Sequence, residues 1–268
     1  MSFLNLSGKT VLVLGVSNKR SVGWAVAQAL LDEGAIPILG VHRPARVAEV
    51  ESFAKGCRIV VCDVENESDI ESLGTRFSQD GIALDGLVHS IAYARYEHSG
   101  MRFHETSRKD FLQAIQISAF SLVEVARHLK PVLNPSASVV TIGISSTQVT
   151  AENYGYMAPI KAALGTMVRY LAKSFSRDTA IRFNSVDAGP LKTRASAGIP
   201  GYLKNYLYAE QLTFRKRALE VQEVASTVLF LLSERSSGIN GQGIVVNAGM
   251  DLNYFDADIV DRVTAIQP

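Results

Sequence analysis

Residues 10–33 read TVLVLGVSNKRSVGWAVAQALLDE, and this stretch decides the fold. Its first five residues are mostly apolar and β-branched, which is typical of a strand covered on both faces. A turn that contains Gly15 follows, and a helical pattern begins at Val22. Such a unit presents backbone N–H groups and the positive end of a helix dipole to a pyrophosphate. The turn is not the usual G-x-G-x-x-G fingerprint, because Ser21 stands where a glycine would be expected.

Apolar runs alternate with helical patterns along the whole chain. The strands that we expect span residues 10–14, 36–41, 58–62, 86–90, 138–142, 182–187 and 243–247. The helices that we expect span residues 22–33, 68–79, 109–129, 154–176 and 221–233. This order predicts a single doubly wound α/β domain of the Rossmann type over residues 1–268, with a mostly parallel seven-stranded sheet and helices on both faces.

The composition excludes several classes of protein. With 47% apolar residues in a chain of 268, there is enough apolar surface for a sizeable core. The formal net charge of +1 indicates no groove for nucleic acid. Cys57 and Cys62 lie far from any Cys or His cluster, so they predict no metal site and suit a reducing compartment. Since no signal sequence and no apolar run of about 18 residues is found, we expect a cytoplasmic protein with no membrane partner.

A tyrosine and a lysine seven positions apart, Tyr154 and Lys161, lie in the helix expected over residues 154–176. At about 100° per residue, seven positions bring the two side chains to one face, about 10 Å apart along the axis. A phenol and an ammonium so placed would act on one bound ligand. Tyr156 would point about 140° away from Lys161 and is the poorer partner. The alternative is an amphipathic helix whose Tyr and Lys simply reach solvent.

Two long excursions, residues 93–108 and 193–217, leave the carboxyl ends of expected strands, where open α/β sheets bind ligands. The second carries Tyr202, Leu203 and Tyr206, whose side chains would line a pocket for an apolar substrate. Its glycines and proline favour a mobile lid over the site. The alternative is a pair of surface helices that packs on a neighbouring subunit.

Polar residues follow other strands at the same edge of the sheet. Asp63 would accept a hydrogen bond from an adenine amino group, and the backbone at Ser90 would approach a ribose. Both residues would equally serve as caps of a turn or a strand end. After the second strand come His42, Arg43 and Arg46, with no acidic residue for a ribose 2′-hydroxyl. These arginines would therefore meet a 2′-phosphate, or else remain solvated.

Four motifs together resemble the divergent short-chain dehydrogenases known as enoyl-[acyl-carrier-protein] reductases. They are Gly15 with Ser21 six positions on, HSIAYA at 89–94, the Tyr154–Lys161 spacing and AGPLKT at 188–193. The wider group has a shorter spacing, which would place its tyrosine at Met157. The resemblance covers essentially the whole chain. It implies reduction of the 2,3 double bond of an enoyl thioester in fatty acid biosynthesis, with NADH or NADPH as cofactor and acyl carrier protein or another acyl thioester as partner.

The resemblance also implies residue roles. Tyr154 would donate a hydrogen bond to the thioester enolate and Lys161 would hold the nicotinamide ribose, which makes them the catalytic candidates. The cofactor-binding candidates are Gly15, Ser21, Val22, His42, Arg43, Asp63, Val64, Ser90, Ile91, Ala92, Lys161, Leu191, Thr193 and Ala195. The substrate-binding candidates are Ala94, Tyr154, Tyr202, Leu203 and Tyr206. The family is commonly tetrameric, and apolar positions such as Ile117, Phe120, Val123, Met167 and Phe175 are compatible with a homotetramer.

Three features depart from the family pattern. Ile144 stands where many members carry a second tyrosine, and Asp187 replaces a small polar residue. The basic patch for an acidic carrier protein is reduced to Lys204, so docking would be weak or would use Arg215, Lys216 and Arg217 instead. Two alternatives remain open: a short-chain dehydrogenase for another carbonyl or alcohol substrate, and a nucleotide-binding homologue without catalysis.

Overall fold

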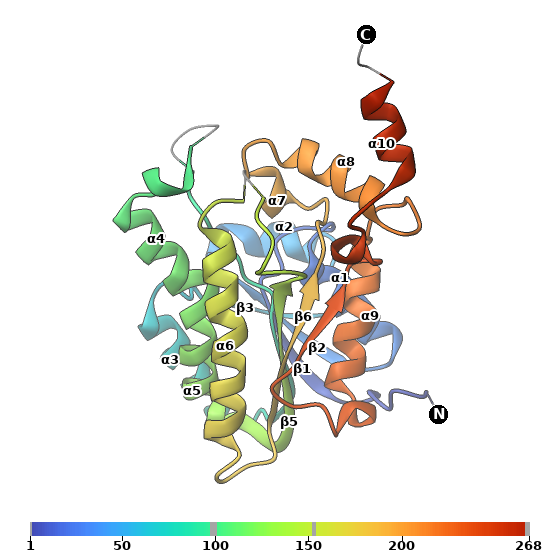
Figure 1. Ribbon diagram of the computed structural model, residues 1–268. Helices are drawn as coiled ribbons and strands as arrows, with labels where there is room; N and C mark the ends of the chain where they lie inside the picture. Colours follow the sequence, from blue (N-terminus) through green and yellow to red (C-terminus); the bar gives the residue numbers. More distant parts are fainter. Residues whose placement is uncertain (1, 97–100, 152–153, 266–268) are drawn as a thin grey trace.

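A seven-stranded parallel sheet forms the centre of the computed structural model, which describes residues 2–96, 101–151 and 154–265 (Figure 1). The strand order is β3-β2-β1-β4-β5-β6-β7. The strands are β1 (Thr10–Leu14), β2 (Ile36–Val41), β3 (Arg58–Val61), β4 (Leu84–His89), β5 (Leu133–Ile144), β6 (Arg182–Ala188) and β7 (Gly243–Val246). The predicted Rossmann-type sheet is confirmed, and each expected strand is present with its ends shifted by five residues at most.

Helices cover both faces of the sheet, as expected for right-handed crossovers between parallel strands (Figure 1). One face is covered by α1 (Val22–Asp32), α2 (Val47–Glu51) and α9 (Val221–Leu232). The other is covered by α3 (Glu67–Gln79), α4 (Arg108–Ile115), α5 (Ser121–Leu129) and α6 (Met157–Phe175). Because side chains alternate along a strand, Leu12 of β1 packs on the second group and Val13 on the first.

The helix that carries Lys161 begins later than expected. It starts at Met157, and Tyr154 lies in a turn before it. Gly155 adopts a left-handed backbone conformation with φ of 54°, which a continuous helix does not allow. The prediction that Tyr154 and Lys161 share one helical face was therefore wrong, because helical rotation does not relate them.

The helix expected over residues 109–129 is also interrupted. A π-helical turn at Gln116–Phe120 separates α4 from α5. Ser118 lies in this turn, and its hydroxyl accepts from the Tyr93 N–H at 2.8 Å and donates to the Tyr93 carbonyl at 2.9 Å. The irregular turn thus holds the start of the first excursion against the helical layer. Apolar periodicity alone did not reveal it.

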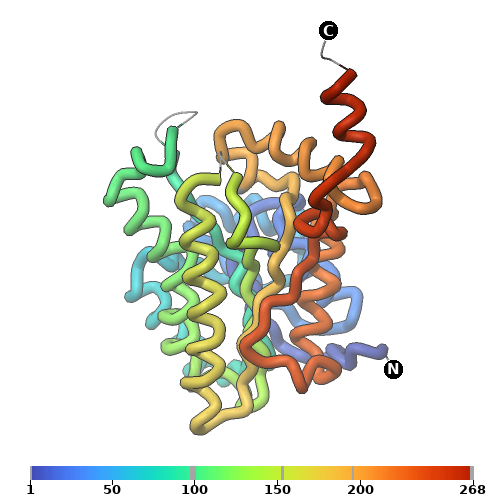
Figure 2. Tube along the Cα trace, viewed as in Figure 1, coloured from blue at the N-terminus to red at the C-terminus, as the bar shows by residue number. Residues whose placement is uncertain are grey.

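The second excursion folds into α7 (Arg194–Ala197) and α8 (Tyr202–Leu212), which lie over the carboxyl ends of the strands (Figure 1). Beyond β7, α10 (Ala257–Thr264) extends away from the body of the molecule (Figure 2). An ion pair between Lys216 and Asp256 ties the start of α10 to the loop after α8. Across the described ranges, none of the helices combines the length and the apolar character needed to span a membrane.

Candidate active site

The turn after β1 packs tightly against the end of β4. Gly15 has a φ of 91°, and a Cβ atom there would lie 2.0 Å from the carbonyl oxygen of Ser90. Only glycine fits this approach. The backbone N–H of Ser90 in turn donates to the carbonyl of Leu14 at 3.1 Å. Two of the predicted cofactor residues, Gly15 and Ser90, are therefore brought together at the carboxyl edge of the sheet.

Ser21 caps the N-terminus of α1. Its hydroxyl accepts from the Trp24 N–H at 3.2 Å and donates to the Asn18 carbonyl at 2.8 Å. The N–H groups of Val22 and Gly23 have no acceptor among the described residues. They are the donors that an anion meets at a helix N-terminus. The apolar side chain of Val22 is buried, so its contribution to phosphate binding would come from its backbone.

Asp63 and Val64 follow β3. One oxygen of the Asp63 carboxylate accepts from the Glu65 N–H at 3.1 Å, so Asp63 does cap a turn. No hydrogen bond from the described residues reaches its second oxygen, Oδ2. The Val64 side chain is buried in the core. An adenine would therefore meet the free oxygen of Asp63 and the backbone of Val64.

The basic residues after β2 differ in their surroundings. Arg46 pairs with Glu49, and Glu49 also lies 3.6 Å from the guanidinium of Arg194. Arg43 is exposed, and its guanidinium forms no hydrogen bond or ion pair within the described part of the chain. Partial burial, followed by the charges of Arg43 and Arg46, lowers the pKa of His42. Of the three, Arg43 is the one with a guanidinium open to an added phosphate.

Lys161 is buried at the centre of this edge. Its Nζ donates to the carbonyl of Ile142 at 2.7 Å and to that of Ile91 at 3.4 Å. Burial lowers the pKa of Lys161 to about 8, and the charge of Asp187 opposes this effect. The exposed Ala92 and the half-buried Ala94 continue the chain from Ile91 along the same edge. Lys161 is thus a poorly solvated ammonium beside residues 90–94.

Tyr154 lies in the turn before α6. Burial, with smaller contributions from Tyr202 and Tyr96, raises the pKa of Tyr154 well above its usual range. Its hydroxyl remains protonated at neutral pH and has no partner in the described ranges. Its carbonyl accepts from the hydroxyl of Tyr96 at 3.1 Å. Tyr154 is therefore a hydrogen-bond donor held in place by its backbone.

Tyr156 serves a different purpose. Its side chain is fully buried, and its hydroxyl accepts from the Arg95 N–H at 2.8 Å and donates to the Arg95 carbonyl. Its ring stacks on Tyr96, with ring centroids 5.4 Å apart. These contacts tie the turn at Tyr154 to the first excursion. They also leave the Tyr156 hydroxyl no proton to donate to a substrate.

The loop after β6 connects the site to the second excursion. The Leu191 carbonyl accepts from the hydroxyls of Tyr202 at 2.9 Å and Ser196 at 2.8 Å. Thr193 N–H donates to the Ser196 hydroxyl at 2.9 Å, which closes the loop into a compact turn. Ala195 lies in α7, but its side chain is outside the described part of the structure. Tyr202 is thereby held near Tyr154.

The other two predicted substrate residues on α8, Leu203 and Tyr206, point in other directions than Tyr202. Tyr206 is half-buried and faces Gly189, Pro190 and Asn247 in a small hollow beneath α8. Leu203 is 57% exposed, so the prediction that it lines the pocket is not supported by this arrangement. Successive residues of a helix point in directions about 100° apart, and Tyr202 already occupies the inward direction.

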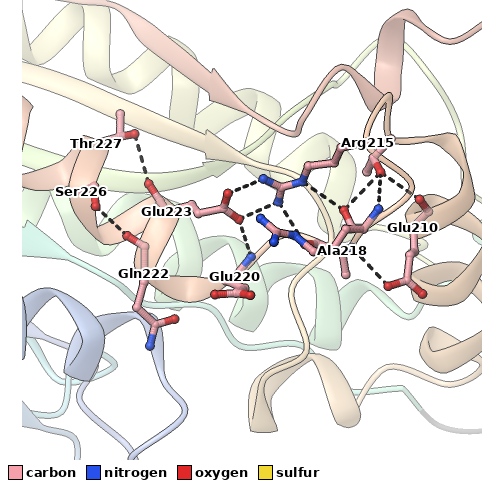
Figure 3. Close-up of polar contacts among 10 residues, drawn as sticks. Glu210, Arg215, Ala218, Glu220, Gln222, Glu223, Ser226 and Thr227 are labelled. Atoms are coloured by element: carbon pink, nitrogen blue, oxygen red, sulfur yellow. Dashed lines mark hydrogen bonds and ion pairs between the residues drawn. The ribbon is translucent and has the colours of Figure 1, made fainter.

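The base of α8 is held by a network of charged groups (Figure 3). Arg215 donates to both carboxylate oxygens of Glu223, one of them at 2.7 Å, and to the Ala218 carbonyl at 3.0 Å. Glu223 also accepts from the Glu220 N–H at 2.8 Å, and Glu210 accepts from the Ala218 N–H at 3.1 Å (Figure 3). Arg215 is paired with Glu223, and Lys216 is paired with Asp256. Neither side chain is therefore free to bind an acidic carrier protein.

Several residues at the site were missed or left unexplained by sequence reasoning. Tyr96 and Ser118 have no pattern that distinguishes them, because both act through contacts with backbone groups distant in sequence. His89 belongs to the noticed run HSIAYA, but its bonding to Ser121 and Thr141 is visible only in the fold. No set of three or more His, Cys, Asp or Glu side chains suited to a metal ion occurs in the described ranges.

The chain is similar to enoyl-[acyl-carrier-protein] reductases along nearly all of its length. A family model described as Enoyl-(Acyl carrier protein) reductase matches residues 15–251. The sequence is 35% identical over 248 residues to the NADH-dependent FabI of Enterococcus faecalis, covering 92% of this chain and 99% of that protein. It is 33% identical over 251 residues to the NADPH-dependent FabI of Staphylococcus aureus, covering 92% and 98%.

Solved structures agree with the sequence comparison. The crystal structure of enoyl-[acyl-carrier-protein] reductase (NADH) from Aquifex aeolicus superposes with a TM-score of 0.89 at 31% identity, covering 94% of this chain and 99% of that one. The enzyme from Bacillus cereus, solved with NADP+ and indole naphthyridinone, superposes with a TM-score of 0.86 at 31% identity, covering 92% and 98%. The chain therefore belongs to the enoyl-(acyl carrier protein) reductase family.

Proposed function

We propose that this chain reduces the 2,3 double bond of an enoyl thioester bound to acyl carrier protein, in fatty acid synthesis, with NADH or NADPH. The observation that carries this proposal is the pair of Tyr154 and Lys161 at the carboxyl edge of the sheet. Tyr154 is a partly buried, protonated phenol with no partner for its hydroxyl among the described residues. Lys161 is a buried ammonium that is held by backbone carbonyls alone. The family assignment supports the same reaction.

The residues present fit a dinucleotide. Gly15 lets the turn after β1 lie directly against Ser90, and the N–H groups of Val22 and Gly23 offer donors to a pyrophosphate. Asp63 offers an acceptor to the adenine, and Lys161 offers a donor to the nicotinamide ribose. When bound, the reduced nicotinamide supplies a hydride to the β-carbon of the double bond.

Tyr154 would stabilise the charge that this reduction creates. As the β-carbon is reduced, negative charge grows on the thioester oxygen. The Tyr154 hydroxyl donates a hydrogen bond to that oxygen, and the Lys161 ammonium adds positive potential where water is scarce. The raised pKa of Tyr154 keeps its proton in place for this task. Protonation at the α-carbon completes the reaction.

A direct assay tests the reaction. Crotonyl thioester and reduced cofactor are mixed with the protein, and cofactor oxidation is followed by the loss of absorbance. We expect turnover that requires the conjugated double bond and is absent with the saturated thioester. Turnover only with ketones or alcohols would assign the chain to another reaction, and binding of cofactor without turnover would make it a non-catalytic homologue.

Arg43 supports a preference for NADPH. Its guanidinium is free in the described part of the chain, whereas Arg46 is paired with Glu49. No acidic residue follows β2 to receive a 2′-hydroxyl. The preference therefore depends on one arginine and not on two.

Carrier docking would use the exposed cations that remain unpaired near α8. Lys204 lies on the outer surface of α8, and Arg217 lies in the loop after it. Neither forms an ion pair among the described residues. An acidic carrier protein would be attracted to these two positions while its acyl chain enters beneath Tyr202.

The α7–α8 segment would serve as the lid of this pocket, and the chain would assemble as a homotetramer. Gly201 precedes α8 with a left-handed φ of 72°, which supplies a flexible joint. For the tetramer, Ile117 and Phe175 offer no support, because both are buried in the chain's own core. Phe120 and Tyr170 are 45% and 76% exposed on the same helical layer, and they support a contact between copies.

A further inference from the structure

Asp187 carries a carboxylate into the layer between the sheet and α6. Phe183, four residues earlier on β6, packs in the core on the α6 side. Because side chains on a strand alternate between faces, Ser185 and Asp187 point to the same side. The Asp187 carboxylate interacts with Lys161 and Arg169, which both belong to α6. Asp187 is thus a half-buried acid that faces the helix carrying the proposed cofactor anchor.

Two glycines make room for this carboxylate. Gly143 of β5 is the direct partner of Asp187, and Gly243 of β7 is the partner of Ser185. A Cβ atom at Gly143 would lie 2.0 Å from Oδ1 of Asp187, and one at Gly243 would lie 2.1 Å from Oδ2. Neither glycine has a positive φ, so backbone conformation does not explain them. Both neighbouring strands lack a side chain where the carboxylate lies.

The surroundings of Lys161 explain what such an acid would do. Its two hydrogen-bond partners are the neutral carbonyls of Ile142 and Ile91. From β4 the fully buried His89 faces it as a neutral ring, since burial lowers the pKa of His89 to about 3. On its own helix, Arg169 is exposed and of like charge. Of the charged groups that act on Lys161, Asp187 is the one that favours the ammonium.

We propose that Asp187 is a positioning residue that keeps Lys161 charged toward the bound cofactor, and that Gly143 and Gly243 serve to admit its carboxylate. The proposal rests on the proposed role of Lys161 as cofactor anchor. No ion pair of 4.0 Å or less joins Asp187 to Lys161 in the described ranges, so the lysine keeps its carbonyl contacts. Asp187 acts through space, where low solvation makes the attraction stronger than in water.

The influences on the pKa values of Lys161 and Asp187 agree with this role. Burial lowers the pKa of Lys161, and without a counter-charge a desolvated ammonium loses its proton more readily. Burial also raises the pKa of Asp187, while the Ser185 hydroxyl, Lys161 and Arg169 act in the opposite direction. Ser185 therefore helps to keep the carboxylate ionised, and the carboxylate in turn favours the charged lysine.

The first experiment compares Asp187→Asn, which keeps the shape and removes the charge, with the native chain. The dissociation constant of the reduced cofactor is measured by its fluorescence from pH 6 to pH 10. In the native chain, binding should weaken above about pH 8, where Lys161 loses its proton. In Asp187→Asn this loss should begin roughly one pH unit lower. At pH 6, where Lys161 is charged in both, the two proteins should bind alike.

Two control variants separate the possible outcomes. Asp178→Asn removes an exposed carboxylate near the far end of α6, paired with Lys130, and should leave the profile unchanged. Lys161→Met should weaken binding at pH 6 and abolish the loss above pH 8. If Lys161→Met binds as the native chain does, the proposed function of Lys161 fails. If Lys161→Met weakens binding but Asp187→Asn keeps the native profile, the role of Asp187 is overturned.

A second measurement tests the glycines without any activity or cofactor. Gly243→Ala should lower Tm in the native background, because its Cβ would overlap the carboxylate at 2.1 Å. In the background of Asp187→Ser, which shortens the side chain, the same change should lower Tm much less. An equal drop in both backgrounds would overturn the claim that Gly243 makes room for Asp187.

Discussion

His89 should make the folded chain sensitive to mild acid. Its ring is fully buried at the end of β4, with Nε2 2.9 Å from the Ser121 hydroxyl and Nδ1 3.1 Å from the Thr141 hydroxyl. Because Ser121 donates its own proton to the Ile117 carbonyl, it accepts from Nε2–H. Burial, and then the charge of Lys161, lower the pKa of His89 from 6.5 to about 3.

The sign and size of the effect follow from proton linkage. Between pH 6.5 and about pH 3 the unfolded chain binds a proton at His89 and the folded chain does not. The free energy of unfolding therefore falls as the pH falls through this window. With these two pKa values, the loss between pH 7 and pH 5 is about 2 kcal/mol. For a chain of this length that corresponds to roughly 4 °C in Tm.

The assay is thermal unfolding at pH 7 and pH 5 for the native chain, His89→Gln and His104→Gln. His89→Gln should be less stable at pH 7, but its Tm should fall by roughly 4 °C less than the native Tm between the two pH values. His104 is exposed, so His104→Gln should behave as the native chain does. Because each variant's fall in Tm from pH 7 to pH 5 is compared with the native fall, the contributions of His42 and the carboxylates cancel. An equal fall for His89→Gln and the native chain would refute the reasoning.

Three further predictions concern cofactor, carrier and assembly. The native chain should prefer NADPH over NADH in kcat/KM by roughly tenfold to a hundredfold, and Arg43→Ala should remove most of this preference. Equal use of both cofactors by the native chain would contradict the prediction. Lys204→Glu should raise KM for an enoyl thioester on acyl carrier protein by roughly fivefold and leave the coenzyme A thioester unaffected; equal effects on both would argue against docking at α8. Light scattering should report four chains of 29.1 kDa, with a smaller species for Phe120→Asp, and a native monomer would exclude the tetramer.

The strands of the sheet were predictable because each one is marked by a short, continuous apolar run in the sequence. Runs such as VLVL at 11–14 are apolar on both faces, and both faces are in fact covered by helices. The helix boundary before Lys161 was not predictable from periodicity, because Tyr154, Gly155 and Tyr156 are compatible with a helix pattern. A left-handed backbone at Gly155 and contacts with Tyr96 decide it. These contacts join residues about 60 positions apart.

The sequence predicted which residues form the site better than it predicted how they are arranged. Motif resemblance identified Gly15, Tyr154 and Lys161, and the fold brings them to one edge of the sheet. The sequence shows Asp187 as a departure from the family pattern but does not explain it. The two glycines that make room for its carboxylate lie on other strands, Gly143 on β5 and Gly243 on β7. Their partnership follows from the sheet register, which a single sequence does not specify.

The central claim is that the hydroxyl of Tyr154 stabilises the enolate, and the kcat of Tyr154→Phe tests it most directly. Turnover of crotonyl thioester should fall by about a hundredfold or more, because one transition-state hydrogen bond is lost, while the dissociation constant of the cofactor stays close to native. Tyr170→Phe, which changes a phenol that is 76% exposed, should retain native turnover. The fall in kcat for Tyr156→Phe should be smaller than the fall for Tyr154→Phe. Native turnover in Tyr154→Phe, or a larger loss in Tyr156→Phe, would contradict the account.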